Sequence, residues 1–172
     1  MRIMACIILL GAVAACGGEA EQNVAAPKAN QLTAGQWELT TEVTAFQTVD
    51  QGEPKIDTPA GTRATELVCV GEGRPPAALF AGEGFLCNFD NHYMRSGRIN
   101  VTLQCAREGL SGAIPITVSG SFEAESLEMT RELRTVLATD GDVQITQRVT
   151  GRRTGECPPE TEGDNQTNAQ EG

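Results

Sequence analysis

Apolar and polar residues alternate with a period of two in several segments between residues 37 and 149 of this 172-residue chain. This period places successive side chains on opposite faces of a strand, so it predicts β-structure with one buried face. The expected inward residues, segment by segment, are Trp37, Leu39, Thr41 and Val43; Thr65, Leu67 and Cys69; Ile114, Ile116, Val118, Gly120 and Phe122; Leu127, Met129, Leu133 and Leu137; and Val143, Ile145 and Val149. We therefore expect a mainly β fold, a single antiparallel curved sheet or open barrel of about seven to eight strands.

Two segments do not follow a strict alternation of apolar and polar residues. In residues 127–137, LEMTRELRTVL, Arg131 and Thr135 interrupt the apolar positions, and the segment is also compatible with a helix by propensity. Residues 74–80, RPPAALF, predict one short helical turn, because proline is tolerated in a first turn and glycines lie on both sides.

Two bends between alternating segments predict β-hairpins. Residues 95–97, Arg-Ser-Gly, suit a three-residue loop with glycine at its left-handed last position. The partners that follow are Met94 with Arg98, Tyr93 with Ile99, Asn91 with Val101, Phe89 with Leu103, and Cys87 with Cys105. A two-residue loop would shift the register by one and separate the cysteines onto opposite faces. Residues 140–142, Asp-Gly-Asp, predict a second hairpin, with Leu137 opposite Ile145 and Leu133 opposite Val149.

The chain contains six cysteines, and its first 16 residues account for two of them. A positive charge followed by the apolar run 3–15 resembles a secretory signal peptide, and this run is too short to span a bilayer. Residues 13–16, Val-Ala-Ala-Cys, resemble a bacterial lipobox, in which the cysteine receives diacylglycerol and the peptide is cut directly before it. We therefore expect a lipoprotein signal peptide over residues 1–15, which contains Cys6, and a lipid anchor on Cys16. The alternative is an ordinary signal peptide that is cut nearby and leaves Cys16 as a thiol.

Four cysteines remain, an even number that suits a disulfide framework in an exported chain. The hairpin register favours a bond between Cys87 and Cys105, which leaves Cys69 to pair with Cys157. The alternative pairs Cys69 with Cys87 and Cys105 with Cys157. The spacing contains no C-x-x-C, so a zinc ribbon is not expected.

Composition divides the chain into four parts. After the signal peptide, residues 16–32 are small and polar, and we expect a flexible tether behind the lipidated cysteine. Residues 33–157 are long enough for one core and form the expected β domain. Residues 158–172 are acidic and have little to bury, so we expect a disordered tail.

Charge and motifs narrow the function. The formal net charge of −10 disfavours nucleic acid as a partner, because phosphates repel a negative surface. His92 is the single histidine and no Gly-x-Ser-x-Gly motif accompanies it, so we interpret it as a polar residue on a strand face. Asp140 and Asp142 lack the remaining positions of a calcium loop. We therefore predict no enzyme activity, no metal and no cofactor.

Several of these features together resemble a known family. They are Gly35-Gln36-Trp37-Glu38 at the first strand, four spaced cysteines, a short proline-containing helix after the first of these, and a terminal Gly155-Glu156-Cys157. They are similar to a family of bacterial envelope proteins, common in proteobacteria including sphingomonads, that is catalogued only as a domain of unknown function. The resemblance covers nearly all of residues 33–157. It implies a β-rich fold and a location facing the periplasm, and it supplies no catalytic residues.

We therefore expect a lipid-anchored protein of the bacterial envelope, facing the periplasm as a binding or interaction module. Gly17-Gly18 after the anchor, where an aspartate is lacking, resembles the pattern for sorting to the outer membrane. The expected partners are the membrane, through the lipid, and another envelope protein. The alternative is a carrier or sensor of a small apolar, lipid-like ligand in the concave face of the sheet, with the walls Trp37, Phe89, Leu103 and Phe122. A hydrolase with an acidic site is a third hypothesis.

Overall fold

A computed structural model describes residues 29–159 of the chain. The expected signal peptide, Cys16, most of the tether and most of the tail lie outside these residues. The elements, in chain order, are β1 (Gly35–Thr48), β2 (Arg63–Val70), α1 (Ala77–Ala81), β3 (Phe85–Arg95), β4 (Arg98–Arg107), β5 (Gly112–Phe122), β6 (Ser126–Arg134), β7 (Val136–Leu137) and β8 (Val143–Gly155). None of the helices in this part of the chain is long or apolar enough to cross a membrane.

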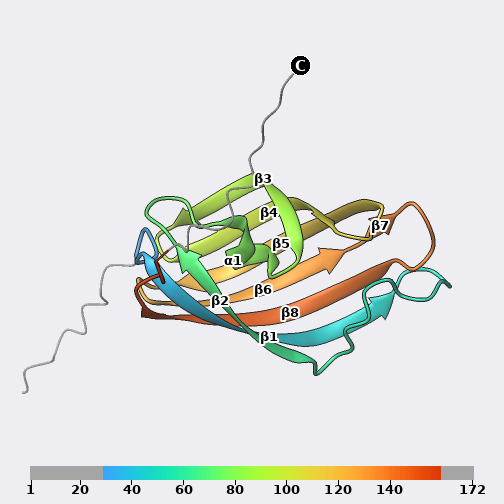
Figure 1. The fold of residues 1–172 in the computed structure, drawn as a ribbon, viewed down its shortest axis with the longest axis horizontal. Coiled ribbons are helices and arrows are strands. Elements are labelled where there is room, and N and C mark those ends of the chain that lie inside the picture. The colour runs from blue at the N-terminus through green and yellow to red at the C-terminus, as the bar shows by residue number, and fades with distance from the viewer. Residues whose placement is uncertain (1–28, 160–172) are drawn as a thin grey trace, which may run out of the picture.

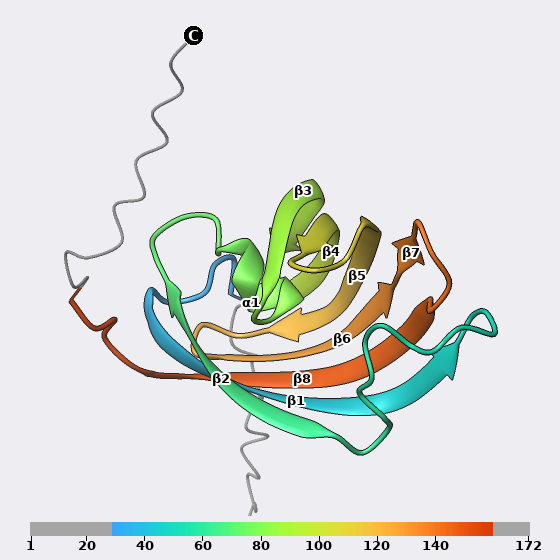
Figure 2. The ribbon, with the colours of Figure 1, turned by 45° about the vertical axis from the view of Figure 1, so that its right-hand side comes forward.

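The strands form one antiparallel sheet in the order β2-β1-β8-β6-β5-β4-β3, and the short β7 pairs with β5. The sheet curls into a half-barrel, so that its two edge strands, β2 and β3, lie on either side of α1 (Figures 1 and 2). This architecture confirms the mainly β fold with seven to eight strands that the alternating pattern predicts. Among residues 29–159 the single short helix follows the two prolines of residues 75–76, as expected.

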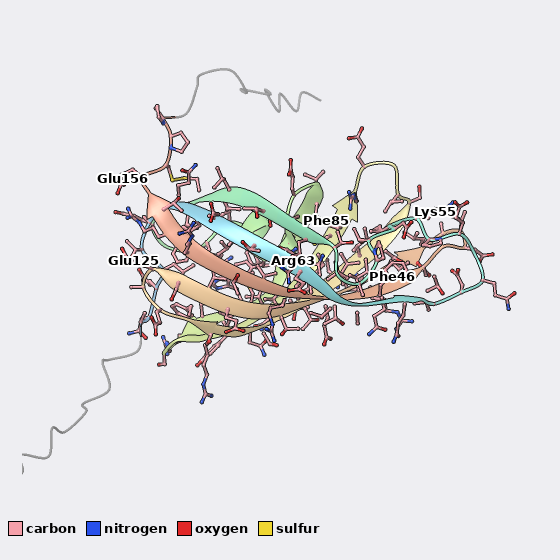
Figure 3. The ribbon with its side chains drawn as sticks, turned by 90° about the horizontal axis from the view of Figure 1, so that it is seen from below. Phe46, Lys55, Arg63, Phe85, Glu125 and Glu156 are labelled. Carbon is pink, nitrogen blue, oxygen red and sulfur yellow. A yellow bond between two sulfur atoms is a disulfide. The ribbon has the colours of Figure 1, made fainter. Side chains whose placement is uncertain are left out.

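The concave face of the half-barrel is the hydrophobic core. Each central strand contributes alternate apolar residues to this face, which is what a sheet with one solvated side requires. Helix α1 completes the core from the open side, because Leu79 and Phe80 are both fully buried. The outer face carries polar and charged side chains, and the view in Figure 3 shows Glu156 and Lys55 at opposite ends of the sheet.

Residues 127–134 form a strand, as the alternating pattern predicts, and the helical alternative is excluded. The two interrupting residues, Arg131 and Thr135, point to the inner face, where they are 3% and 1% exposed. One detail of the pattern differs from expectation. In β2 the inward residues are Val68 and Val70, and Leu67 is 61% exposed on the outer face. The expectation that Leu67 lies in the core was therefore wrong, because the inward positions of β2 are shifted by one residue from those predicted.

The β3–β4 hairpin has a different loop from the one predicted. Its loop contains two residues, Ser96 and Gly97, both with positive φ, and Arg95 pairs with Arg98. The positive φ at both positions is what a tight two-residue hairpin turn requires. The pairings predicted near the loop were therefore wrong by one residue; the observed partners are Met94 with Ile99, Tyr93 with Asn100, His92 with Val101 and Asn91 with Thr102.

A β-bulge restores the predicted register further along the same hairpin. The pairing shifts between Phe89 and Asn91, so that Asp90 is an extra residue in β3. Beyond it, Phe89 lies opposite Leu103 and Cys87 opposite Cys105, as predicted. The register shift at the bulge offsets the shift caused by the two-residue loop, so the two cysteines lie opposite each other despite the shorter turn.

The second predicted hairpin was wrong in its register. Leu133 pairs with Ile145 and Met129 with Val149, so the connection between β6 and β8 is longer than three residues. The chain leaves β6 after Arg134 and forms β7, which pairs with β5. Backbone and hydroxyl groups of Thr135 bond to Val143, which fixes the start of β8.

One disulfide lies at each edge strand of the sheet, and the two pairs are those that the hairpin register favours. Cys87 bonds Cys105 across β3 and β4, with a sequence separation of 18 residues. Cys69 bonds Cys157 with a separation of 88 residues. The second bond passes over the start of β1, because Gln36 pairs with Cys69 on one side and Gly155 on the other. It therefore fixes an edge strand to the last residues of the domain.

Asp50 connects two loops at the far end of the half-barrel. Its carboxylate accepts hydrogen bonds from the backbone N–H groups of Gly52 (2.8 Å), Gly141 (2.9 Å) and Asp142 (3.0 Å). These bonds, that from Asp142 first, lower the pKa of Asp50 below its usual value. The carboxylate form is therefore favoured in the folded state.

Replacement of Asp50 by alanine is expected to lower the melting temperature at pH 7, because three buried or half-buried N–H groups lose their acceptor. A lowered pKa in the folded state stabilises the fold above about pH 4, and this contribution is lost as the pH falls through the folded pKa. Thermal melts between pH 7 and pH 2.5 should therefore show the Asp50→Ala deficit shrinking at low pH. The neighbouring Asp140→Ala is the control. A deficit of the same size at both ends of the pH range would contradict the assignment.

Candidate functional site

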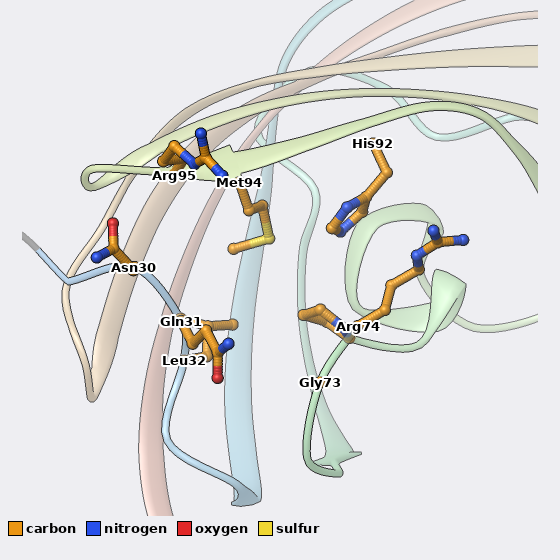
Figure 4. A pocket seen from close by; sticks show the side chains of 9 residues that line it. Asn30, Gln31, Leu32, Gly73, Arg74, His92, Met94 and Arg95 are labelled. Atoms are coloured by element: carbon orange, nitrogen blue, oxygen red, sulfur yellow. The ribbon is translucent and has the colours of Figure 1, made fainter.

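A cavity of about 580 Å³ opens at the end of the half-barrel where β1 begins. Its walls come from three separate parts of the chain: the segment before β1, the loop before α1, and the end of β3 (Figure 4). The lining residues are Asn30, Gln31, Leu32, Gly73, Arg74, Pro75, His92, Met94 and Arg95.

The first wall is residues 29–33, which we call the N-terminal strap. It crosses the end of the half-barrel and is held by backbone and side-chain hydrogen bonds to two turns. These bonds are Gly97 N–H to the Ala29 carbonyl (2.8 Å), Ser96 N–H to Asn30 Oδ1 (3.2 Å), and Thr33 N–H to the Ala124 carbonyl (2.7 Å). Trp37 Nε1 also donates to the Thr33 carbonyl, at 3.1 Å. Leu32 is 9% exposed, so the strap is fastened to the core as well as to the turns.

The second wall is the loop of residues 73–75, between β2 and α1. Pro75 is buried there, and its fixed φ directs the chain into the helix. The guanidinium carbon of Arg74 lies 5.5 Å from the centroid of the Phe89 ring, a distance at which a cation is attracted to an aromatic face. This contact holds the guanidinium of Arg74, an exposed residue, over the Phe89 ring.

His92 projects from β3 toward the second wall (Figure 4). Its ring packs edge-to-face with Phe89 at 5.2 Å and with Phe80 at 6.0 Å. Burial, and then the positive charge of Arg74, lower the pKa of His92, so the imidazole is neutral at pH 7. Its Nε2 atom is buried and has no hydrogen-bond partner among the described residues.

The charged residues that line the cavity are all positive. Arg74 and Arg95 line it, no acidic residue does, and neither guanidinium forms an ion pair with a residue that the structure describes. Leu32, Pro75 and Met94 supply apolar surface between them. The two guanidinium groups are directed away from the space between Leu32, Met94 and Pro75 (Figure 4). That of Arg74 lies over the Phe89 ring, and Arg95 is an outward, exposed residue of β3. The lining residues include no serine, threonine or cysteine beside His92.

The four residues predicted as ligand-pocket walls do not line this cavity. Trp37 and Leu103 are fully buried in the core, and Phe122 is 4% exposed. Phe89 is half-buried, and its ring contacts both the Arg74 guanidinium and the His92 ring. Within residues 29–159 the structure brings together no group of three or more His, Cys, Asp or Glu side chains that could hold a metal ion.

Sequence reasoning missed the cavity because it depends on the bulge at Asp90. Unbroken alternation from Phe89 would place Asn91 and Tyr93 on the inner face. The extra residue reverses this, so His92 and Met94 face inward and Tyr93 is 47% exposed. The prediction that His92 is a polar residue of a strand face did not include this reversal.

Comparison with known proteins gives one finding. A family model described as "Protein of unknown function (DUF3617)" matches residues 32–157, which include all of the strands and both disulfides. No match was found among curated proteins or among solved structures.

Proposed function

The chain belongs to this family of proteins of unknown function, and from that premise we propose that it is a lipid-tethered interaction module of the bacterial envelope, facing the periplasm. The lipobox-like residues 13–16 support the tether. The two disulfides support an oxidising compartment, because such bonds persist in exported proteins. Gly17-Gly18 supports the outer membrane as the site of the anchor.

The observation that carries the interaction role is the open edge of β3. This strand is 11 residues long, stands last in the sheet, and pairs only with β4 among the described residues. Leu86 is 78% exposed on it, and Tyr93 is 47% exposed. An unpaired edge with exposed apolar residues is a template for another strand, which folded monomers usually protect.

The partner that this edge suits is another envelope protein that supplies an extended segment. Addition of a strand to a sheet edge gives affinity through main-chain hydrogen bonds and specificity through alternate side chains. The alternate outward residues of β3 include Leu86, Asn88 and Tyr93, which combine apolar contact with amide hydrogen bonding.

The filled inner face favours this role over a carrier of an apolar ligand. Trp37, Leu103 and Phe80 are fully buried in one hydrophobic core. Helix α1, which contains Phe80, covers the open side of the half-barrel. A lipid-like ligand in the concave face would have to displace this helix.

Two measurements test the proposal. Intact-mass analysis of the native product should show diacylglycerol on an amino-terminal Cys16, and an unacylated chain would contradict the tether. A photocrosslinking amino acid at Leu86 or Tyr93 should give a discrete adduct with one envelope protein in living cells. The control is the same probe at Thr117, an exposed residue of the central strand β5. Equal adducts at Thr117 and Leu86, or none at Leu86, would contradict the role of the edge.

A further inference from the structure

We propose that the turn end of the β3–β4 hairpin contacts the headgroups of an anionic phospholipid membrane, the same membrane that holds the acyl chains of Cys16. This inference rests on the lipid tether of the proposed function. It concerns the turn and the outer face of the hairpin, and it does not depend on a partner at the open edge of β3.

The N-terminal strap connects the tether to this turn. The Ala29 carbonyl accepts a 2.8 Å hydrogen bond from the N–H of Gly97, and Asn30 Oδ1 accepts one of 3.2 Å from the N–H of Ser96. Figure 4 shows Asn30 near the end of β3. The tether therefore reaches the described domain at the β3–β4 turn.

The length of the tether keeps this turn close to the membrane. Cys16 precedes Ala29 by 13 residues, which span no more than about 47 Å even when fully extended. Strand β1, with 14 residues, extends about 43 Å from this end of the half-barrel to the other. The β3–β4 turn is therefore among the parts of the domain nearest to the anchor, and the loops at the other end of β1 are much farther from it.

The hairpin carries positive charge and no carboxylate over most of its length. Residues 91–107 contain three arginines and neither aspartate nor glutamate, in a chain with 23 acidic residues. Arg95 and Arg98 are both exposed and lie directly opposite each other beside the turn. Like charges in such a cross-strand pair repel each other, and neither arginine forms an ion pair with a residue that the structure describes. A lipid phosphate at this pair relieves the repulsion and accepts charge-assisted hydrogen bonds.

The acidic residues at this end of the sheet belong to other segments. Glu123 and Glu125 lie in the β5–β6 turn, and Glu72 lies in the loop between β2 and α1. The neighbour of Arg98 on β5 is Ser121, so the surface without carboxylates continues from β3 onto β5. We therefore assign the contact to the β3–β4 turn and not to the whole end of the half-barrel.

The tether makes a contact of two arginines sufficient. One arginine near an anionic membrane raises partitioning about fivefold, so two raise it about 25-fold, which is little for a free protein. A short linker turns this weak contact into an intramolecular one with a high effective concentration. The attraction acts over about 10 Å at moderate ionic strength, so the contact is expected to depend on salt.

Paramagnetic relaxation of backbone amides measures the contact. The acylated chain is reconstituted in nanodiscs of equimolar phosphatidylethanolamine and phosphatidylglycerol that contain a gadolinium-chelating lipid. We expect the amides of residues 95–98 to relax at least twice as strongly as those of residues 108–111, at the opposite end of β4. The tether alone also brings the turn closer to the lipid. The deciding comparison is therefore with neutral phosphatidylcholine nanodiscs, in which the effect at residues 95–98 should fall at least twofold.

Charge-matched variants connect the effect to the two arginines. Arg95→Gln combined with Arg98→Gln should reduce the relaxation at the turn to its value in neutral nanodiscs. The control is Arg107→Gln combined with Arg134→Gln, which removes the same charge from strand ends at the opposite end of the sheet. This control should leave the relaxation at residues 95–98 unchanged.

Four results would overturn the proposal: equal relaxation at the two ends, equal relaxation in neutral and anionic nanodiscs, equal behaviour of the two double variants, or signal shifts at residues 95–98 that need an envelope protein in place of lipid. Intact-mass analysis of Cys16 separates these results from a failure of the proposed function. An acylated chain with any of the four leaves the tether standing, whereas an unacylated chain removes both the tether and the membrane contact.

Discussion

Replacement of both Cys69 and Cys157 by alanine is expected to lower the free energy of unfolding by about 4.5 kcal/mol. The bond closes a loop with a sequence separation of 88 residues, and a longer loop restricts the unfolded chain more. It also fixes β2, an edge strand that pairs with β1 alone. Urea unfolding of the oxidised protein and of the variant measures the difference.

The second disulfide provides the comparison. The bond between Cys87 and Cys105 has a separation of 18 residues and joins strands that are already paired. Its replacement by two alanines is expected to cost about 3 kcal/mol in the chain-entropy model. A larger loss from the short loop than from the long one would show that native packing around Cys105, which is 5% exposed, outweighs the effect on the unfolded chain.

Glu66→Ala is expected to cost about 3 kcal/mol, because it leaves the guanidinium of Arg131 charged and without its counter-ion in the core. Arg131 is 3% exposed, and its Nη2 lies 3.8 Å from Glu66 Oε1. Burial lowers the pKa of Arg131 to about 10, so the group is still protonated at pH 7. Glu66 also accepts a 3.0 Å hydrogen bond from the backbone N–H of Glu83, just after α1.

Substitution of Arg131, the other member of this ion pair, should have a smaller effect on the free energy of unfolding than Glu66→Ala. Arg131 makes one hydrogen bond, from Nη1 to Gln147 Oε1 at 3.2 Å, and its Nε and Nη2 have no hydrogen-bond partner among the described residues. Arg131→Met should therefore cost less than Glu66→Ala, since the carboxylate that it leaves without a counter-ion is 17% exposed and keeps the hydrogen bond from the N–H of Glu83. In the Arg131→Met background, Glu66→Ala should cost much less than it does alone. Additive losses in this double-mutant cycle would contradict a direct interaction.

Much of the fold follows from the alternating pattern, because burial on one face of an antiparallel sheet imposes that pattern directly. Trp37, Ile116 and Val149 are inward as predicted. The disulfide pairs also follow, although the hairpin loop that suggested one of them was wrong. Their prediction succeeded because an inserted residue at Asp90 compensates for the shorter loop at Ser96.

The pattern does not predict the face of Leu67 or the hairpin registers near the loops, and it does not predict polar interactions between segments distant in the sequence. Arg131 occupies a core position since Glu66 reaches it from another strand. The connection before β8 is set by Asp50, 91 residues away from Gly141 in the sequence. The candidate site is also formed by segments that are distant in the sequence: the strap, the loop before α1 and His92, which the bulge at Asp90 turns inward.

The N-terminal strap also determines how the domain responds to a mechanical load from its preceding residues. A pull on Ala29 acts first on its bond to the turn at Gly97 and then on the bond between Thr33 and Ala124. We expect these hydrogen bonds to break in sequence, beginning with the one nearest Ala29, while the strands behind the strap stay paired. Tension on the strap is therefore expected to remove one wall of the cavity before it separates any pair of strands.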